Sequence, residues 1–375
     1  MKPEPGMNFF YPYPEPLTEE KPRHLQAWKT AAALAARHPV TMAVADQNTF
    51  KGGPLQLEIL VWPRFRQIGP LWISLQKRFM QRCRDYLSSQ PEDVLVYLRH
   101  LRLADFLLSS GVRQKIVFEV HEFFSENDEL TQKQAAALQK MEGRVFLKSA
   151  GLVCITHGLV DALNERYLRL PPVVVAPDGC DLAVPDLENS GFETDLIYAG
   201  SLHPWKGVET LVKAMVYLPG RSLKVLGGSA QEVARLKLLA RSWGVDDRCE
   251  LLGRVPAKEV ELHLERARVG VVPNHAHAIG TRFTSPLKVF EYLAAGRPVA
   301  ASDLPSLREV LDESVARFAP PGSPRSLAVA AEKLLKDEAK LAQMSQAARR
   351  LAENFTWQKR AEKIEDFVSK LLSNV

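Results

Sequence analysis

The sequence predicts an α/β protein of two doubly wound lobes, each with a parallel β-sheet between layers of helices. Three observations predict it. The chain has 375 residues, more than a single hydrophobic core usually supports, so two domains are expected. Short apolar runs alternate with amphipathic helical patterns, which is typical of buried parallel strands joined by helices. Between Asp181 and Thr194 this alternation lapses into acids, proline, serine and glycine, which indicates a boundary.

Each lobe has its own series of elements. Apolar runs in the first half predict strands at Met7–Tyr11, Val40–Ala45, Leu57–Val61, Val94–Leu98, Ile116–Val120, Leu152–Ile155 and Val173–Ala176. Those in the second half predict strands at Leu196–Ala199, Leu223–Leu226, Glu250–Leu252, Val269–Val272 and Val299–Ala301. Amphipathic stretches predict helices at Gln26–Arg37, Gln134–Lys148, Val208–Leu218, Gln231–Trp243 and Leu287–Ala295. Thr356–Leu372 predicts a last helix, which Thr356 could cap.

Composition and charge exclude several classes of protein. The net charge of +5 and the 46% apolar content are ordinary for a globular chain. Nucleic-acid binding would require a denser basic stripe with aromatic residues than this sequence has, or a known binding module, so no nucleic-acid partner is expected. The cysteines lack metal-ligand spacing and are expected to be free thiols in a reducing compartment. No apolar run approaches the roughly 20 residues of a membrane span, and Met1–Gly6 lacks a signal peptide's apolar core, so a cytoplasmic location is expected.

The segment Thr281–Val299 (TRFTSPLKVFEYLAAGRPV) carries the strongest local pattern. Ser285 followed by Pro286 predicts a helix start, since serine is a favoured N-cap and proline a favoured first residue. Lys288 and Glu291 are three residues apart and share a face near that end. The helix terminus and Lys288 suit a phosphate, and Glu291 could accept hydrogen bonds from a vicinal diol such as a ribose. A surface helix with a Lys–Glu pair is the alternative.

A second pattern lies in Thr194–Leu211, where a strand runs into a loop with Gly200 and a helix opens at Lys206 and Gly207. Lysine at such a turn, on the carboxyl edge of a sheet, is well placed as a point charge on a phosphate. A solvated lysine in the first helical turn is the alternative. The spacing of a P-loop is absent, and no Gly-x-Gly-x-x-Gly follows an early strand, so a nicotinamide or flavin cofactor is not expected.

Taken together and in order, these segments resemble the family-4 (group 1) glycosyltransferases of the GT-B fold, in which two Rossmann-like lobes face each other across a cleft. The resemblance includes GRVPAKEV (Gly253–Val260), VVPN (Val271–Asn274) and SDLPSLREV (Ser302–Val310) in the second half. In the first half it includes FEVHEFF (Phe118–Phe124), VCITHGL (Val153–Leu159) and VVVAPDGCDL (Val173–Leu182). FTWQKRAEKI (Phe355–Ile364) resembles the closing helix that crosses back to the first lobe. The implied domains are residues 1–185 with the helix 357–375, on the acceptor side, and residues 186–356, which bind the nucleotide sugar.

The resemblance implies a retaining transfer of a sugar from a nucleoside diphosphate sugar to a polysaccharide, glycolipid or other hydroxyl acceptor. Carried over by position, Lys206 would hold the pyrophosphate, Glu291 the ribose, and His121 would face the donor sugar; these are the predicted catalytic residues. The predicted donor-binding residues are Gly200, Ser201, Arg254, Val255, Arg282, Phe283, Thr284, Ser285 and Lys288. Positive groups and helix N–H groups would stabilise the leaving diphosphate, so neither a metal nor an enzyme nucleophile is expected. His275 and His277 form the one metal-like spacing and are interpreted as a chance pair.

Two positions depart from the family pattern. Phe283 stands eight residues before Glu291, where the family usually has a glutamate that contacts the donor sugar. Ser201 stands where many members have arginine, and Arg282 could supply that charge. Either donor recognition differs from the commonest pattern or activity is reduced. Two alternatives therefore stay open: a nucleotide-sugar epimerase on the same fold, and a catalytically weak nucleotide-sugar-binding subunit.

The acceptor side is expected in the first lobe. Arg99 follows a predicted strand and could meet an anionic acceptor. Between Trp62 and Arg84 basic residues are interleaved with aromatic ones and no acid is present. Such a stretch could lie on an anionic membrane surface, which would suit a lipid-linked acceptor, or it could be a solvated helix whose aromatic side chains pack inward. Both interpretations stay open.

Overall fold

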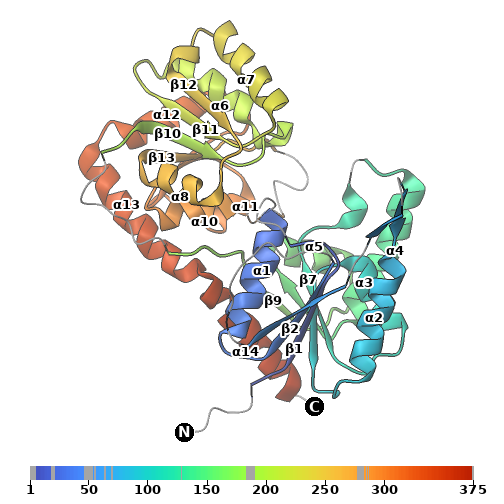
Figure 1. Ribbon diagram of the computed structural model, residues 1–375. Helices are drawn as coiled ribbons and strands as arrows, with labels where there is room; N and C mark the ends of the chain where they lie inside the picture. The colour runs from blue at the N-terminus through green and yellow to red at the C-terminus, as the bar shows by residue number, and fades with distance from the viewer. Residues whose placement is uncertain are drawn as a thin grey trace. The chain divides into compact units, whose positions relative to one another are not determined.

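A computed structural model shows the architecture of the chain (Figure 1). It describes residues 6–17, 22–45, 54, 56–62, 65–68, 71–127, 129–182, 191–276, 283, 285 and 287–373. The chain divides into two compact units. Unit 1 comprises Met1–Pro177 and Trp357–Val375, and unit 2 comprises Asp178–Thr356. The boundary predicted between residues 185 and 186 falls among residues 183–190, outside the described residues.

Unit 1 is built on a seven-stranded parallel sheet with the strand order β3-β2-β1-β6-β7-β8-β9. Its strands are β1 (Phe9–Tyr13), β2 (Val40–Val44), β3 (Leu57–Val61), β6 (Leu95–Leu98), β7 (Ile116–Val120), β8 (Gly151–Cys154) and β9 (Val173–Val175). β1, β6, β7 and β8 are buried along their whole length, as continuous apolar runs between two helical layers should be. The chain order reverses between β1 and β6, which pair directly, so this is a doubly wound sheet.

The helices of unit 1 include one from the end of the chain. They are α1 (Pro22–Ala35), α2 (Gln76–Ser88), α3 (Leu101–Ser109), α4 (Gln132–Lys148), α5 (His157–Arg166) and α14 (Trp357–Ser373), with a 3-10 turn η1 (Phe124–Glu126). Figure 1 shows α14, in red, beside α1, in blue. Arg37, after α1, joins the two through an ion pair with Glu365 at 2.9 Å between Nε and Oε2. Ile364, Phe367 and Val368 form part of the buried face of α14, which is thus an amphipathic helix.

Unit 2 is built on a six-stranded parallel sheet with the strand order β12-β11-β10-β13-β14-β15. The strands are β10 (Thr194–Ala199), β11 (Leu223–Leu226), β12 (Cys249–Gly253), β13 (Ala267–Val272), β14 (Val299–Ser302) and β15 (Ala316–Ala319). The chain runs outward from β10 to β12 and then returns to pair β13 with β10. The order therefore reverses between β10 and β13, and in open α/β sheets ligands bind beyond the carboxyl ends of the strands at such a reversal.

Helices cover both faces of this second sheet. They are α6 (Val208–Ala214), α7 (Ala230–Ser242), α8 (Ala257–Glu265), α10 (Leu287–Ala294), α11 (Pro305–Arg308), α12 (Pro324–Leu335) and α13 (Glu338–Ala352). The 3-10 turns are η2 (Pro204–Lys206), η3 (Met215–Tyr217), η4 (Asp246–Arg248) and η5 (Glu353–Phe355). Side chains of β10 alternate between two core layers: Leu196 and Tyr198 belong to one, and Ile197 and Ala199 to the other.

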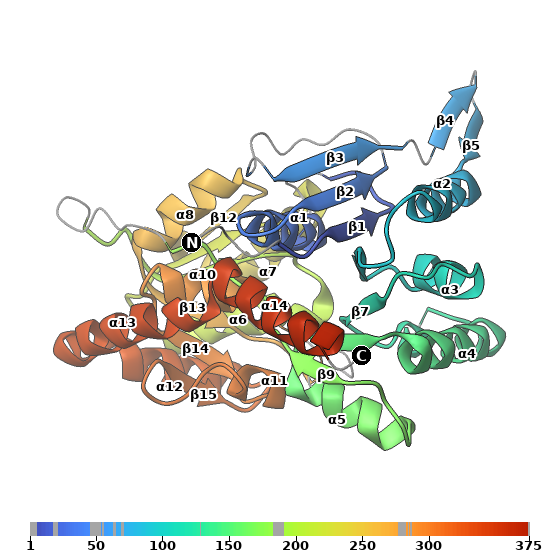
Figure 2. The same ribbon diagram turned by 90° about the horizontal axis from the view of Figure 1, so that it is seen from below.

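The predicted fold class is confirmed. Each apolar run predicted as a strand lies on a strand, with ends that differ by at most two residues. Sequence patterns missed β15, because its sequence ARFA has a charged residue on a short edge strand and no continuous apolar run. They also missed the antiparallel hairpin of β4 (Phe65–Ile68) and β5 (Leu71–Ser74). Figure 2 shows this hairpin projecting from unit 1 away from the main sheet.

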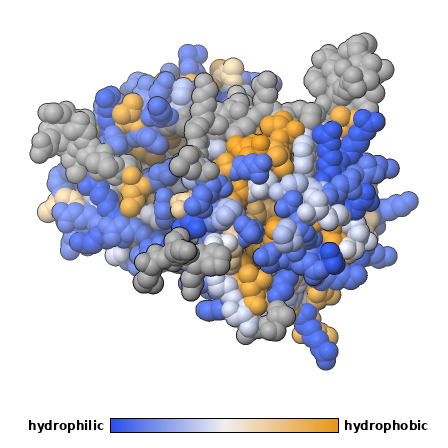
Figure 3. All heavy atoms as spheres, turned by 60° about the horizontal axis from the view of Figure 1, so that its bottom comes forward, coloured by the Kyte–Doolittle hydropathy of each residue, from blue (hydrophilic) through white to orange (hydrophobic). Residues whose placement is uncertain are grey.

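Helix α2 presents a basic face to solvent and an apolar face to the core. Phe79, Cys83 and Leu87 are buried, whereas the exposed side chains include Lys77, Arg78 and Arg82. The Trp62 ring packs edge-on against Phe79, with 5.8 Å between the ring centroids. The side chains of Phe65 and Trp72 lie outside the described residues. The surface seen in Figure 3 is largely hydrophilic with a few apolar patches, and no helix in the described ranges is long and apolar enough to span a bilayer.

Candidate active site

The reversal between β10 and β13 brings two loops and one helix together in unit 2. Gly200 follows β10 with φ 146°, in a region that favours glycine. A Cβ atom built on Gly200 would lie 2.7 Å from Nζ of Lys288 on α10. The strand end needs glycine because other residues rarely adopt this φ, and a side chain here would also displace the Lys288 amine.

The loop that carries Lys206 is fastened to the loop after β13. Gly207 adopts φ 68°, and a Cβ atom there would lie 1.9 Å from the carbonyl oxygen of Pro273. His275 N donates a hydrogen bond to the carbonyl of Trp205 at 2.8 Å, and its Nε2 lies 2.8 Å from Oγ1 of Thr210. The imidazole of His275 thus has a structural partner in α6. His277, the second member of the predicted pair, lies outside the described residues.

Lys206 lies at the end of η2 and is half-buried. Its Nζ is 3.7 Å from the centroid of the Trp205 ring, a cation–π contact. Burial lowers the pKa of the Lys206 amine to about 8. A bound anion would favour the charged form and raise this pKa again.

Lys288 is more deeply enclosed. Its side chain is buried, Nζ lies 3.7 Å from the centroid of the Tyr198 ring, and Nζ has no hydrogen-bond partner within the described part of the chain. Burial, and secondly the Lys206 ammonium, hold the pKa of Lys288 well below its ordinary value, while Glu291 acts in the opposite direction. Lys206 and Glu291 both influence this amine, so each of them lies within electrostatic reach of Lys288.

Asn274 is a site residue that the predicted set did not include. It follows β13 by two residues, is 1% exposed, and its Oδ1 has no hydrogen-bond partner in the ranges described above. Buried polar atoms are normally paired, so an unpaired one beyond the sheet's carboxyl edge indicates a place for a ligand or water. The sequence signal was present, since Asn274 ends the VVPN segment, but a lone asparagine after a strand carries no chemistry of its own.

Glu291, Ser285 and Phe283 lie on α10 and the segment before it. Glu291 is half-buried; burial raises its pKa, and the neighbouring Lys288 partly offsets that rise. Ser285 is buried, and its hydroxyl accepts a hydrogen bond from Asp178 N at 3.2 Å. The side chain of Phe283 is 3% exposed. Arg282 and Thr284 lie outside the described residues, as does Pro286 of the predicted helix start.

Ser201, Arg254 and Val255 also follow strand ends of this sheet. The carbonyl of Ser201 accepts a hydrogen bond from the Tyr198 hydroxyl at 2.6 Å, which holds the loop after Gly200. Arg254 is exposed and Val255 half-buried, directly after β12. Arg254 lines a hollow of about 610 Å³ with residues of β12 and α7. This volume lies within the range of small-molecule sites.

The predicted residues of unit 1 belong to a separate polar cluster. His121 follows β7, and its Nε2 contacts Oε1 of Glu119. Burial, and secondly Arg99, lower the pKa of His121 to about 4. Arg99 follows β6 and donates through Nη1 to Oε1 of Gln26 on α1. The guanidinium of Arg99 therefore has a partner within unit 1, which the sequence did not indicate.

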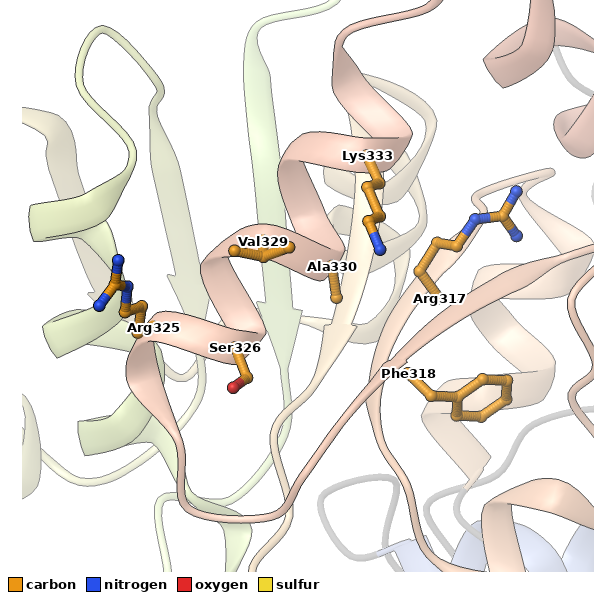
Figure 4. A pocket seen from close by; sticks show the side chains of 7 residues that line it. All are labelled: Arg317, Phe318, Arg325, Ser326, Val329, Ala330 and Lys333. Carbon is orange, nitrogen blue, oxygen red and sulfur yellow. The ribbon is translucent and has the colours of Figure 1, made fainter.

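A second hollow in unit 2 lies away from these residues. It has a volume of about 300 Å³ and is lined by side chains of β15 and α12, as Figure 4 shows. Its basic lining side chains are Arg317, Arg325 and Lys333. None of the predicted site residues lines it.

A known protein-family model matches the part of the chain that contains this candidate site. The model of the glycosyl transferases group 1 family matches residues 186–351. These residues are therefore similar to a group 1 glycosyltransferase domain. The matched region includes the loop after β10, the loop after β13 and all of α10, so it contains every predicted donor-binding residue.

Curated relatives share moderate identity with parts of this chain. A D-inositol 3-phosphate glycosyltransferase from Corynebacterium diphtheriae is 31% identical over 180 residues, which are 45% of this chain and 41% of that protein. A protein of the same name from Xylanimonas cellulosilytica is 29% identical over 247 residues, 60% of this chain and 58% of that protein. The chain thus matches about half the length of these relatives.

Solved structures resemble nearly the whole chain. Sucrose-phosphate synthase from Thermosynechococcus elongatus has a TM-score of 0.78 at 18% identity, covering 98% of this chain and 100% of that one. HepE from Anabaena, solved in complex with UDP-glucose, has a TM-score of 0.74 at 17% identity, covering 97% and 100%. At these identities the likeness concerns the fold, which is GT-B.

Proposed function

We propose that this protein transfers a sugar from a nucleoside diphosphate sugar to a hydroxyl acceptor with retention of anomeric configuration. The observation that carries the proposal is a pair of buried polar atoms at the reversal in unit 2, Nζ of Lys288 and Oδ1 of Asn274, which have no hydrogen-bond partner among the described residues. Lys206 supplies a second amine, whose charge acts on that of Lys288. Within the described residues neither amine is hydrogen-bonded to a carboxylate, and two such amines suit a diphosphate.

The proposed chemistry needs little covalent help from the protein. The bond between the anomeric carbon and the β-phosphate oxygen breaks, and the acceptor oxygen bonds to the same face of that carbon. The departing diphosphate accepts the acceptor's proton. Lys206, Lys288 and N–H groups before α10 stabilise the charge that develops on the leaving group. His121 is the proposed catalytic residue of unit 1, and Glu291 would hold the ribose.

Because lysine side chains would supply the positive charge at the diphosphate, we also propose that transfer of a hexosyl group proceeds without a divalent metal. Transfer rates measured in excess EDTA should equal those measured with added Mg²⁺ or Mn²⁺. Loss of transfer in EDTA, restored by one of these ions, would contradict this part of the proposal.

The direct test is a thermal-shift screen across nucleoside diphosphates and their sugars, followed by an assay of transfer with the stabilising donor. A ligand that binds only the folded state raises its melting temperature. Donor consumption together with a glycosylated acceptor supports the proposal. An isomerised sugar from donor alone would support an epimerase instead, because that reaction needs no acceptor. Binding without turnover of any donor would support a binding subunit, which the buried Phe283 in place of an acid would then explain.

Affinity for nucleoside diphosphates should depend on pH. The free protein has a Lys206 pKa of about 8, and an anion stabilises the ammonium form. Binding is therefore expected to take up a proton above that pH, and affinity to fall by up to about tenfold per pH unit as pH rises further. Calorimetry between pH 6 and about 9.5 measures this fall. A smaller fall is expected for Lys206→Arg, since arginine stays charged. The same fall in both proteins would show that Lys206 is not the titrating group.

The exposed basic face of α2 suggests a partner for unit 1. We propose that Lys77, Arg78 and Arg82 attract this face to an anionic membrane surface. Vesicles containing phosphatidylglycerol should bind the protein at low salt, and neutral vesicles should not. Each such charge contributes about 1 kcal/mol, so reversing all of them to glutamate should weaken binding by about a hundredfold or more. Equal binding of the triple variant and the wild type would contradict the proposal.

A further inference from the structure

Glu119 is the centre of a buried polar network in unit 1. Its Oε1 accepts hydrogen bonds from Nη2 of Arg360 at 2.7 Å and from Nε2 of Gln26 at 3.0 Å, and it is contacted by Nε2 of His121. Glu119 and Arg360 are each 1% exposed. Arg360 lies on α14, 241 residues further along the chain.

Arg360 is held in place by more than this ion pair. Its Nε donates to Oγ1 of Thr30 on α1 at 3.2 Å, and its Nη1 donates to the carbonyl of Pro177 at 2.9 Å and to that of Ala176. A guanidinium fixed by partners on several sides presents one Nη2 group in a defined direction. It therefore fixes the carboxylate of Glu119 in turn.

The charges of this network determine where the proton of His121 lies. Although burial raises the pKa of Glu119, Arg360 and then His121 lower it well below its usual range. The carboxylate therefore stays ionised near neutral pH, and an ionised carboxylate only accepts hydrogen bonds. The imidazole nitrogen that contacts it must then carry a hydrogen. Because the pKa of His121 is about 4, the neutral ring has no second proton on Nδ1.

The neighbouring amide agrees with this assignment. Oε1 of Gln26 accepts from Nη1 of Arg99, so the amino group of the same amide is left to donate. That amino group lies 3.2 Å from Nε2 of His121 and 3.0 Å from Oε1 of Glu119. With a hydrogen on Nε2 of His121, this nitrogen and the amino group of Gln26 both donate to Oε1 of Glu119. Neither of the two groups then has to accept a hydrogen bond from the other.

We infer that Glu119, anchored by Arg360, holds His121 in the Nε2–H tautomer and leaves Nδ1 as a hydrogen-bond acceptor for a hydroxyl of the sugar substrate. Glu119 and Arg360 are then positioning residues that act through His121. A buried carboxylate that orients a histidine and selects its tautomer is an established device in enzymes. The inference rests on the proposed catalytic role of His121.

The tautomer can be measured without any substrate. Protein labelled with ¹⁵N-histidine gives two-bond ¹H–¹⁵N correlations whose pattern distinguishes the tautomers, and His121→Asn assigns the signals. We expect the Nε2–H pattern at pH 7 and no titration of His121 down to about pH 5, from its low pKa. The Nδ1–H pattern, or an imidazolium at pH 7, would overturn the inference. Failure of the proposed function would appear instead as a wild type that transfers no sugar from any donor.

Steady-state kinetics test whether Glu119 and Arg360 act through His121. In Glu119→Leu/Arg360→Met the buried ion pair becomes apolar, an exchange that folded proteins often tolerate. We expect kcat to fall about tenfold, the worth of roughly one hydrogen bond. Adding His121→Ala to this double variant should lower kcat little further, because the double variant and His121→Ala remove the same function. If the fold losses in kcat multiply instead, Glu119 and Arg360 act independently of His121. That result would overturn their role as positioning residues. Should the double variant not fold, the tautomer measurement on the wild type still decides.

Arg37→Ala is the matched control. It removes a different ion pair of α14, the one between Glu365 and Arg37, which lies just after α1; among the described residues, the other ion-pair partner of Glu365 is His38. We expect kcat and the His121 tautomer to remain as in the wild type. A tenfold loss of kcat in this control would mean that docking of α14, rather than orientation of His121, explains the effect of Arg360.

Discussion

Replacing Lys206 with alanine is expected to lower kcat for sugar transfer by about 10²–10³-fold, the loss typical of removing one preorganised group that stabilises developing negative charge. The amine is half-buried against Trp205, and its loop is fastened to the loop after β13 through His275. It is therefore placed before the substrate arrives, and water replaces it poorly. Steady-state kinetics with the donor identified by the thermal screen measure the effect.

Glu291→Ala should change a different parameter. If its carboxylate accepts hydrogen bonds from the ribose, the variant loses donor affinity by about ten- to a hundredfold, as measured by calorimetry, with a smaller effect on kcat. Lys213→Ala, on α6 beyond the site, is the matched control and should retain wild-type rates. Wild-type donor turnover in both the Lys206 and Glu291 variants would exclude the proposed site.

Replacing Lys288 with methionine is expected to stabilise the free protein while weakening diphosphate binding. The amine is buried, has no hydrogen-bond partner in the described residues, and is opposed by the Lys206 ammonium. An unsatisfied buried polar group costs about 1–3 kcal/mol, and methionine fills a similar space without that cost. Denaturant unfolding should show a gain of this size, and calorimetry a weaker affinity for nucleoside diphosphates.

The gain in stability should depend on pH with a defined sign. The folded-state pKa of Lys288 is lowered from its ordinary value of 10.5. At a pH between the lowered folded-state pKa and 10.5, the unfolded chain binds a proton on Lys288 that the folded chain does not. The free energy of unfolding of the wild type therefore rises with pH in this range. The advantage of K288M should therefore shrink toward pH 10. Lys258→Met, at an exposed position, is the control and should change stability little. A less stable K288M would mean that the amine has a partner in solution.

Stability and function would then oppose each other at this position. A lysine that is unfavourable in the free protein becomes favourable when an anion enters, so part of the binding free energy compensates an existing cost. Natural active sites commonly retain groups of this kind. Gly200 belongs to the same arrangement, since a side chain there would collide with the lysine.

Most of the fold could be predicted because its signals are local. Buried parallel strands are continuous apolar runs, and runs such as Ile116–Val120 and Leu223–Leu226 match their strands residue for residue. The edge strand β15 was not predicted, because half-exposed positions at a sheet edge tolerate a charged residue such as Arg317, which interrupts the apolar run. The hairpin of β4 and β5 was not predicted, because the basic and aromatic residues of this segment indicate an amphipathic stretch rather than two paired strands.

The site could be predicted only in part. Lys206, Lys288 and Glu291 could be proposed from the sequence because each stands near the start of a helix after a strand, a position that sequence patterns recognise. Asn274 could not, because what marks it is a buried Oδ1 with no hydrogen-bond partner among the described residues. Arg99 was predicted to meet an acceptor, and its bond to Gln26 depends on an approach between β6 and α1 that no local pattern records.

The sequence by itself determined the doubly wound fold class, the elements of each lobe and the positions of the residues that bear charge at the carboxyl edge of the second sheet. Only the tertiary structure decided their protonation and partners. The amine of Lys288 is perturbed because Tyr198 and Gly200 enclose it, and His121 has a defined tautomer because Arg360, 241 residues from Glu119, fixes the intervening carboxylate. Periodicity follows from neighbours along the chain, whereas burial and pairing follow from residues that only folding brings together.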